Sequence, residues 1–186
     1  MQSKPRRMTV SEFLAWADST QPQGRYELVR GEIVAMAPER VRHAVIKGPV
    51  FRALGDAIQR AGVPCTAFPD GLMVVIDDDH AREPDVSVQC GALADLDSMV
   101  LDAPLIVVEV VSSSSERTDR DVKLKEYFLV PSIQHYLIVD PARKAVIHHA
   151  RNPGGDIAER IASAGEIDLT PPGMKVPVAE LLPEIG

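Results

Sequence analysis

Residues 104–111 read PLIVVEVV, an apolar run that contains a single charged residue, Glu109. A short, continuous apolar run is typical of a strand that is buried on both faces of a sheet, so we expect the central strand of the fold here. A carboxylate in such a strand is costly to remove from water unless a positive charge meets it. The sequence therefore predicts that Glu109 is held in the interior for a cation.

The next residues, 112–127, read SSSSERTDRDVKLKEY and are expected to form a helix that begins near Ser114. Ser113 and Glu116 have the spacing of a capping box, and an apolar face follows toward Tyr127. Tyr127 is interpreted as a core residue of this helix. The four serines are better explained by helix capping than by a nucleophile, because no GxSxG motif surrounds them.

Lys123 is the residue of this helix that we expect to reach Glu109. A helix that follows a strand runs back alongside it, and Lys123 lies about 13 Å along the helix at about 1.5 Å per residue. Glu109 lies about 10 Å back along the strand at about 3.3 Å per residue, so the two positions match. The alternative for Lys123 is a surface ion pair with Asp119, one turn earlier.

Two further acidic residues alternate with hydrophobic residues and are therefore expected on strands: Glu27 in YELV and Asp85 in EPDVSV. Magnesium prefers hard oxygen ligands and is commonly held by one or two carboxylates together with substrate phosphate. Asp85 and Glu109 are the expected metal pair. The alternatives are a turn role for Asp85 after Pro84, a solvent-facing position for Glu27 on an edge hairpin, and a purely structural ion pair for Glu109.

The remaining patterns predict an α/β sandwich around a mixed sheet, in one domain that spans the 186 residues. Thr9 and Glu12 have capping-box spacing and predict a first helix. Residues 41–61 carry apolar residues at intervals of three and four, which predicts a long helix with a kink or restart at Gly48-Pro49. The other expected elements are a hairpin in 25–36 with Tyr26, Leu28, Ile33 and Val34 facing inward, strands in 66–79, 83–90, 135–140 and 145–150 with Asp77 to Asp79 in a solvated turn, and a short helix in 178–182.

The composition limits the possible functions. The formal net charge is −7, which argues against a general nucleic-acid coat protein. The first 60 residues are nevertheless basic, so a local basic face is possible; its candidates are Arg25, Arg30, Arg40, Arg42, Lys47 and Arg52. Cys65 and Cys90 lack the spacing of a disulfide framework or a zinc site and are expected as buried thiols. No apolar run has the length of a signal peptide or a membrane span, so we expect a cytoplasmic protein without membrane partners.

Several motifs together resemble one nuclease family. RYELVRGEIVAMAP, a following His43, EPDVSV, VVEVVSSSSERTDRDVKLKEY and HYLIVDP occur in this order. They are similar to the Uma-type restriction endonuclease family, within the PD-(D/E)xK nuclease superfamily. The similarity covers residues 9–150, with additional strands and a tail in 151–186. It implies a restriction-endonuclease-like mixed β-sheet flanked by helices, dependence on Mg²⁺ with Mn²⁺ as a substitute, and phosphodiester hydrolysis.

The resemblance also implies roles for individual residues. Asp85 corresponds to the motif aspartate, Glu109 to the second acidic ligand, and Glu27 to the helix-glutamate-like position. The superfamily pattern places a lysine two residues after the second acid, but that position is Val111 here. The resemblance implies that Lys123 replaces this lysine, with Lys125 as the weaker candidate.

The resulting hypothesis is a magnesium-dependent endonuclease that hydrolyses DNA. Asp85 and Glu109 hold the metal, Lys123 orients water and stabilises phosphate charge, and Glu27 supports a second metal or a water. A homodimer is expected because cutting two strands suits two-fold symmetry. Two alternatives stay open: a catalytically silent binding or scaffold protein with the same fold, and a hydrolase of another phosphodiester. His43 is a minor candidate for phosphate contact or helix capping.

Overall fold

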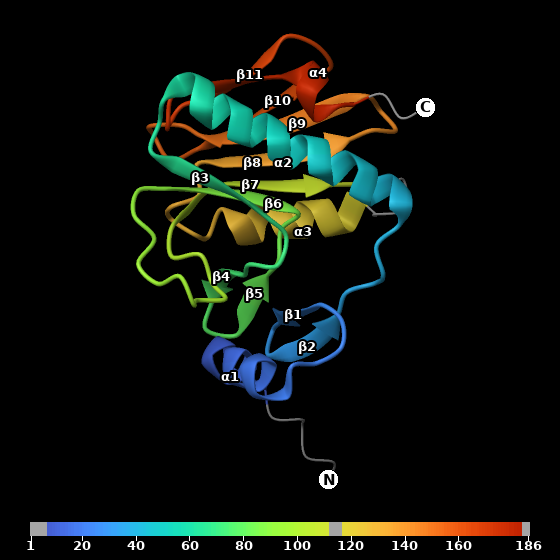
Figure 1. The fold of residues 1–186 in the computed structure, drawn as a ribbon, viewed down its shortest axis with the longest axis vertical. Coiled ribbons are helices and arrows are strands. Elements are labelled where there is room, and N and C mark those ends of the chain that lie inside the picture. The colour runs from blue at the N-terminus through green and yellow to red at the C-terminus, as the bar shows by residue number, and fades with distance from the viewer. Residues whose placement is uncertain (1–6, 112–116, 184–186) are drawn as a thin grey trace.

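The computed structural model describes residues 7–111 and 117–183. Its main feature is a six-stranded sheet in the order β10-β9-β8-β7-β6-β3 (Figure 1). The parallel pair is β7 with β8, and the other neighbours are antiparallel. The sheet is therefore mixed, as the sequence predicts. Its strands are β3 (Cys65–Pro69), β6 (Val86–Cys90), β7 (Pro104–Val110), β8 (His135–Asp140), β9 (Ala145–Arg151) and β10 (Ile157–Ala162).

β7 is an inner strand and is buried on both faces, which explains its apolar sequence. Val108 and Val110 pack in the cluster formed with α2 (Val41–Ala61), whereas Val107 packs on the other face with Tyr127 of α3 (Arg117–Tyr127). The helices therefore lie on opposite faces, and α2 crosses the strands in Figure 1. The α2 face is completed by α4 (Val178–Leu181) and the hairpin of β11 (Glu166–Leu169) and β12 (Met174–Pro177).

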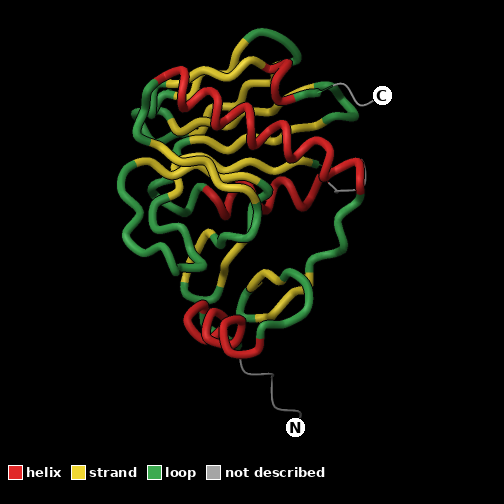
Figure 2. The backbone as a smooth tube through the Cα atoms, viewed as in Figure 1, coloured by secondary structure: helices red, strands yellow, loops and turns green. Residues whose placement is uncertain are grey.

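A second, four-stranded sheet has the order β2-β1-β5-β4. Its strands are β1 (Tyr26–Val29), β2 (Glu32–Ala35), β4 (Val74–Asp77) and β5 (His80–Arg82), and α1 (Val10–Thr20) packs against it. Figure 2 shows these short strands in the lower half of the molecule, next to α1. Val74 lies in the same cluster as Val107 and Tyr127, so this small sheet lies on the α3 side of the main sheet.

The β1–β2 turn has a backbone that requires a special residue. Arg30 and Gly31 have φ values of 51° and 75°, which suits the two-residue turns that match strand twist. A Cβ at Gly31 would lie 2.6 Å from the Cβ of Arg7. Glycine is therefore needed both for the left-handed conformation and for the close approach of the preceding segment.

Helices form in the segments where they are predicted. Thr9 and Glu12 form the reciprocal capping box of α1, with distances of 2.9 and 3.2 Å. α2 has the predicted bounds but continues through Pro49 without a restart. Gly48 has no Cβ to clash with the proline ring, which removes much of the usual penalty for a helical residue before proline. The capping box predicted at Ser113 and Glu116 lies outside the described residues.

Two side chains of the hairpin were predicted to face inward but are exposed. Ile33 and Val34 are 36% and 42% exposed. They lie on β2, the edge strand of the small sheet, and every residue of this strand is exposed. Alternation in the sequence identifies the strand. It does not reveal whether another layer of the fold packs on its apolar face.

The prediction for the cysteines is wrong. Cys65 of β3 and Cys90 of β6 are register partners and form a disulfide. Both are half-buried and pack against the core on the α2 face. They are 25 residues apart in sequence, so the pairing becomes visible only once the two strands are placed side by side. Within the described parts of the chain, no helix is long and apolar enough to cross a membrane.

Candidate metal and active site

The expected contact between Lys123 and Glu109 is present. Lys123 Nζ donates to Glu109 Oε1 at 3.0 Å, and the hydroxyl of Tyr127 donates to the same oxygen at 2.6 Å. Lys123 and Tyr127 are one turn apart on α3, so both reach the strand from the same helix face. Tyr127 is fully buried, as expected for a core residue, but its hydroxyl also fixes the acid. The side chain of Asp119, the alternative partner of Lys123, lies outside the described residues.

Burial dominates the electrostatics of Glu109, which is 8% exposed. Loss of water raises its pKa, the charge of Lys123 acts in the opposite direction, and the nearby negative charge of Asp85 raises it further. The pKa of Tyr127 is also raised, by burial and then by the charge of Glu109. The charges of Glu109 and Asp85 thus act unfavourably on each other, and a bound cation would relieve this repulsion.

Asp85 lies just before β6, next to Glu109 on β7. The register that pairs Val86 with Val108 brings these two acids to neighbouring positions. Asp85 Oδ2 accepts a hydrogen bond from the backbone N–H of Val110 at 2.8 Å. The predicted acid pair is therefore brought together, with Asp85 at a bend directly before β6.

His43 lies in the first turn of α2 and faces Asp85. Its Nε2 lies 3.1 Å from Asp85 Oδ2 and 2.7 Å from the carbonyl oxygen of Val110, and its Nδ1 contacts Glu39. The hydrogen bond to Asp85 is the main cause that raises the pKa of His43 to about 9, despite partial burial. Both ring nitrogens therefore carry protons at neutral pH, and the imidazolium fixes Asp85 from the α2 side.

Lys47, one turn after His43, is a site residue that the motifs do not identify. It is 9% exposed, its Nζ contacts Glu39 and lies 2.9 Å from Asp70 Oδ2, and Asp85 Oδ1 is 4.0 Å away. A signal exists in the sequence, because Lys47 interrupts the apolar stripe of α2 directly after Ile46. Among the basic-face candidates, Lys47 and Arg25 are committed to acidic partners, whereas Arg30, Arg40, Arg42 and Arg52 are exposed.

Glu27 is buried, and therefore does not face solvent, but it has partners other than the acid pair. Its Oε2 accepts from Arg82 Nη1 at 2.7 Å, and its Oε1 accepts from the backbone N–H of Glu83 at 3.2 Å. Arg82 also contacts both carboxylate oxygens of Glu126, at 2.8 and 3.1 Å. Glu27 is on β1, which pairs with β5 as well as β2, so this strand is internal rather than at the edge. Both of its oxygens are thus occupied by donors.

Two groups of side chains could hold a metal ion among residues 7–111 and 117–183, in each of which the ligand atoms lie within 4.8 Å of one another. One contains Asp85 with Glu39 and His43; the other contains Asp77, Asp79 and His80 in the β4–β5 turn. Glu27 and Glu109 belong to neither group. In the second group, Asp77 is exposed and accepts from the backbone N–H of Asp79, and His80 lies 3.1 Å from Glu126.

The acid pair itself has the chemistry that a hard cation requires. The described hydrogen bonds go to Oε1 of Glu109 and to Oδ2 of Asp85, and Asp85 Oδ1 lies 4.0 Å from Lys47 Nζ. Both side chains are carboxylates, which are the ligand type that magnesium prefers. Water and substrate phosphate commonly supply the remaining ligands of such a site.

Comparisons with known proteins agree with this architecture. A solved structure from Anabaena variabilis, described as a putative nuclease belonging to DUF820, matches with a TM-score of 0.70 over 94% of this chain and 97% of that chain, at 17% identity. The uncharacterized protein slr1290 of Synechocystis sp. is 26% identical over 151 residues, which are 81% of this chain and 77% of that protein. The sequence model of the Uma2 family, described as "Putative restriction endonuclease", matches residues 10–179. The chain therefore belongs to the Uma2 family.

Proposed function

We propose that this protein is a magnesium-dependent endonuclease that hydrolyses phosphodiester bonds in DNA. The observation that carries the proposal is the buried carboxylate of Glu109 on a central strand, beside Asp85 and 3.0 Å from the ammonium of Lys123. Membership of a family described as restriction endonucleases supports DNA as the substrate.

In this proposal Asp85 and Glu109 hold the metal, and Lys123 is the catalytic cation. A bound Mg²⁺ supplies Lewis-acid polarisation of the phosphate and a more acidic water. Lys123 donates to Glu109, and in the proposed reaction its ammonium orients the attacking water or stabilises the charge that develops on a phosphoryl oxygen. Tyr127 holds Glu109 in place through its hydroxyl.

The proposal also assigns roles to Glu27 and His43. Glu27 can support a second metal or a water only if Arg82 moves away. Arg82 and the backbone N–H of Glu83 now donate hydrogen bonds to the two carboxylate oxygens of Glu27. His43 donates to Asp85 and to Val110 O, so we assign it the positioning of Asp85. Ligation of a metal by His43 would first require loss of its proton.

The proposal includes a homodimer and a cytoplasmic location. Two copies related by a two-fold axis would present two sites to the two antiparallel strands of DNA. Cytoplasmic thiols are usually kept reduced, so Cys65 and Cys90 would exist there as thiols rather than as the disulfide. The oxidation state of this pair in cells is therefore a test of the location.

The proposed activity is tested by incubation of supercoiled plasmid with the purified protein and Mg²⁺ or Mn²⁺. The wild-type protein should nick the plasmid, and Glu109→Gln should abolish nicking because it removes the charge and keeps the shape. Glu180→Gln is the matched control: Glu180 pairs with Arg60 in the last turn of α2, whereas His43 and Lys47 lie near its beginning, so activity should not change. Nicking by folded Glu109→Gln at the wild-type rate would exclude the assigned site. A folded wild-type protein that binds DNA without metal-dependent cleavage would favour the silent scaffold.

A further inference from the structure

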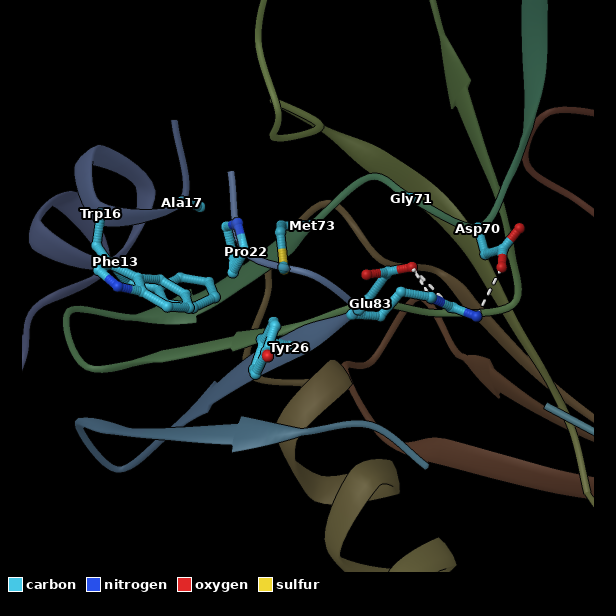
Figure 3. A pocket seen from close by; sticks show the side chains of 11 residues that line it. Phe13, Trp16, Ala17, Pro22, Tyr26, Asp70, Gly71, Met73 and Glu83 are labelled. Carbon is cyan, nitrogen blue, oxygen red and sulfur yellow. Dashed lines mark hydrogen bonds and ion pairs between the residues drawn. The ribbon is translucent and has the colours of Figure 1, made fainter. Parts of the chain in front are cut away.

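A pocket of about 410 Å³ lies between α1, the start of β1 and the loop that precedes β4. Figure 3 shows Phe13 and Trp16 at one end of the pocket and Glu83 and Asp70 at the other. Trp16 and Tyr26 meet edge to face, with ring centroids 5.4 Å apart and planes at 89°. Both rings are half-buried, so each packs on the α1 core and keeps part of its surface on the pocket.

The polar end of the pocket is linked to the proposed active site by ion pairs. Arg25 lies 2.7 Å from Asp70, and Lys47 lies 2.9 Å from the same carboxylate oxygen and 4.0 Å from Asp85. Glu83, which lines the pocket, precedes Asp85 by two residues, or at most about 7 Å of chain. A strand whose phosphate lies at the acid pair would therefore have the base of a neighbouring nucleotide within reach of the pocket.

The charges that line the pocket exclude a phosphate as its ligand. The pocket has one guanidinium, Arg25, which already contacts Asp70 and Glu83. Two carboxylates against one cation repel an anion, whereas carboxylate oxygens accept hydrogen bonds from the exocyclic amino groups of bases. The occupant that fits is therefore an uncharged group with N–H donors.

The aromatic end specifies a flat occupant. Aromatic faces bind nucleobases by stacking, with little dependence on the identity of the base. The volume is at the lower end of the range of small-ligand pockets. A flat heterocycle with amino donors, placed one nucleotide from a phosphodiester site, is a nucleobase.

We propose that this pocket binds an unpaired base of the DNA strand that is cut, an inference that rests on the proposed nuclease function. A base within a duplex is stacked on both faces and paired at its edge, so it can enter only from a single strand or after extrusion from the helix. The net charge of −7 agrees with this, because binding to intact duplex depends on cationic contacts with many phosphates. The substrate class is DNA with an unpaired nucleotide beside the scissile phosphate.

The chain contains one tryptophan, Trp16, so its fluorescence reports directly on the pocket. The protein is titrated in EDTA, so that no strand is cut, with a short single-stranded oligodeoxynucleotide and with a matched oligonucleotide whose residues are abasic. Both carry the same phosphates. We expect the base-containing strand to quench Trp16 and to bind between about five- and a hundredfold more tightly than the abasic strand, the range of one to a few stacked bases.

A variant pair tests the role of the ring. Tyr26→Leu should lower the affinity for the base-containing strand and leave the affinity for the abasic strand unchanged, whereas Tyr26→Phe retains the ring and should bind as the wild type does. Circular dichroism checks that each variant is folded. The comparison of the two oligonucleotides needs no variant, so it decides the question even if Tyr26→Leu does not fold.

The outcomes separate this inference from the proposed function. Equal quenching and equal affinity for both oligonucleotides would overturn base binding. Metal-dependent cleavage of DNA without any change in Trp16 fluorescence would also overturn it and would leave the nuclease proposal intact. Selective quenching by bases in a protein that cuts no DNA would uphold the pocket and reject the nuclease proposal.

Discussion

Glu109 depends on Lys123 to keep its charge inside the protein. Its burial raises its pKa, and the lysine is the main influence in the opposite direction. Exchange of such a partner for an apolar residue leaves a buried charge without compensation, which typically costs about 3 kcal/mol. The pair therefore contributes to stability and to the proposed chemistry at the same time.

Lys123→Met should lower the free energy of unfolding at pH 8 by about 3 kcal/mol. It should also slow DNA cleavage by at least about a hundredfold, the usual effect of removing one group that stabilises transition-state charge. Lys125→Met is the matched control, because Lys125 is exposed two residues later on the same helix. Urea denaturation and the plasmid assay provide the two measurements.

The double variant Lys123→Met/Glu109→Gln distinguishes the two effects. Stability should return toward the wild-type value because position 109 no longer carries a buried charge without a partner, while cleavage should stay abolished. A Lys123→Met protein as stable as the wild type, or one that cuts at the same rate, would show that the ammonium is not the partner of Glu109 in solution.

At the site, spacing along one strand and the next helix was enough to predict the contact between Glu109 and Lys123. The contacts of Asp85 with His43 and Lys47 could not be predicted in this way, because they join α2 to a loop about 40 residues further along the chain. Glu27 shows a different limit. Alternation places it on a strand but does not reveal that Arg82, 55 residues away, will neutralise it.

Among the secondary-structure elements, β3 and β6 are joined by a disulfide bond. β3 is an edge strand of the six-stranded sheet, and the bond from Cys65 to Cys90 ties it to β6. A disulfide stabilises a fold chiefly by restricting the unfolded chain, and a loop of this length corresponds to about 3 kcal/mol. Opening the bond should therefore lower the stability of the whole fold.

Reduction of the disulfide with dithiothreitol should lower the free energy of unfolding by about 3 kcal/mol, as measured in urea. The Cys65→Ser/Cys90→Ser variant should match the reduced protein and should not respond to the reductant. Identical denaturation curves for the wild-type protein with and without dithiothreitol would mean that the bond does not form or does not constrain the unfolded chain.

Helices and strands with a strong apolar pattern could be predicted from the sequence, whereas the burial of their side chains could not. The apolar period of residues 41–61 specifies α2 to the residue, and the run around Glu109 specifies β7. Whether an element is covered depends on partners far away in sequence. Ile33 and Val34 were expected inward yet are exposed, because none of the described residues forms a layer over the edge strand β2.

For the molecule as a whole, we propose that the two sheets form one cooperative domain. Val74 of the small sheet packs in one cluster with Val107 and Tyr127 of the main sheet and α3. The ion pairs of Arg82 with Glu126 and of Lys47 with Asp70 also join the two parts. Unfolding of one sheet would expose apolar surface of the other, so separate unfolding is costly.

Buried histidines make the stability of this domain depend on pH. His135 of β8 and His148 of β9 share a hydrogen bond of 2.9 Å, and burial lowers the pKa of His148 to about 4. Between pH 6.5 and 4 the unfolded chain binds a proton at His148 that the folded chain does not, so stability falls as the pH falls. The limiting slope for one such group is about 1.4 kcal/mol per pH unit.

His43 has the opposite effect on stability, because its pKa is raised to about 9 in the folded protein. Its protonated form stabilises the fold fully below pH 6.5, and this contribution is lost as the pH rises through 9.

The free energy of unfolding should therefore be highest near pH 6.5 and decrease on both sides, more steeply toward acid because the pKa values of His135 and His149 are also lowered by burial. Urea denaturation in steps from pH 9 to pH 5, followed by circular dichroism and by Trp16 fluorescence, measures this curve. Trp16 lies beside the small sheet, whereas circular dichroism reports on all elements, so the two midpoints should coincide at every pH. His148→Gln should flatten the acid side alone. If the free energy of unfolding does not fall toward acid pH, or if His148→Gln does not change this fall, His148 accepts a proton within the folded protein. If the midpoints from circular dichroism and from Trp16 fluorescence differ, the small sheet unfolds by itself.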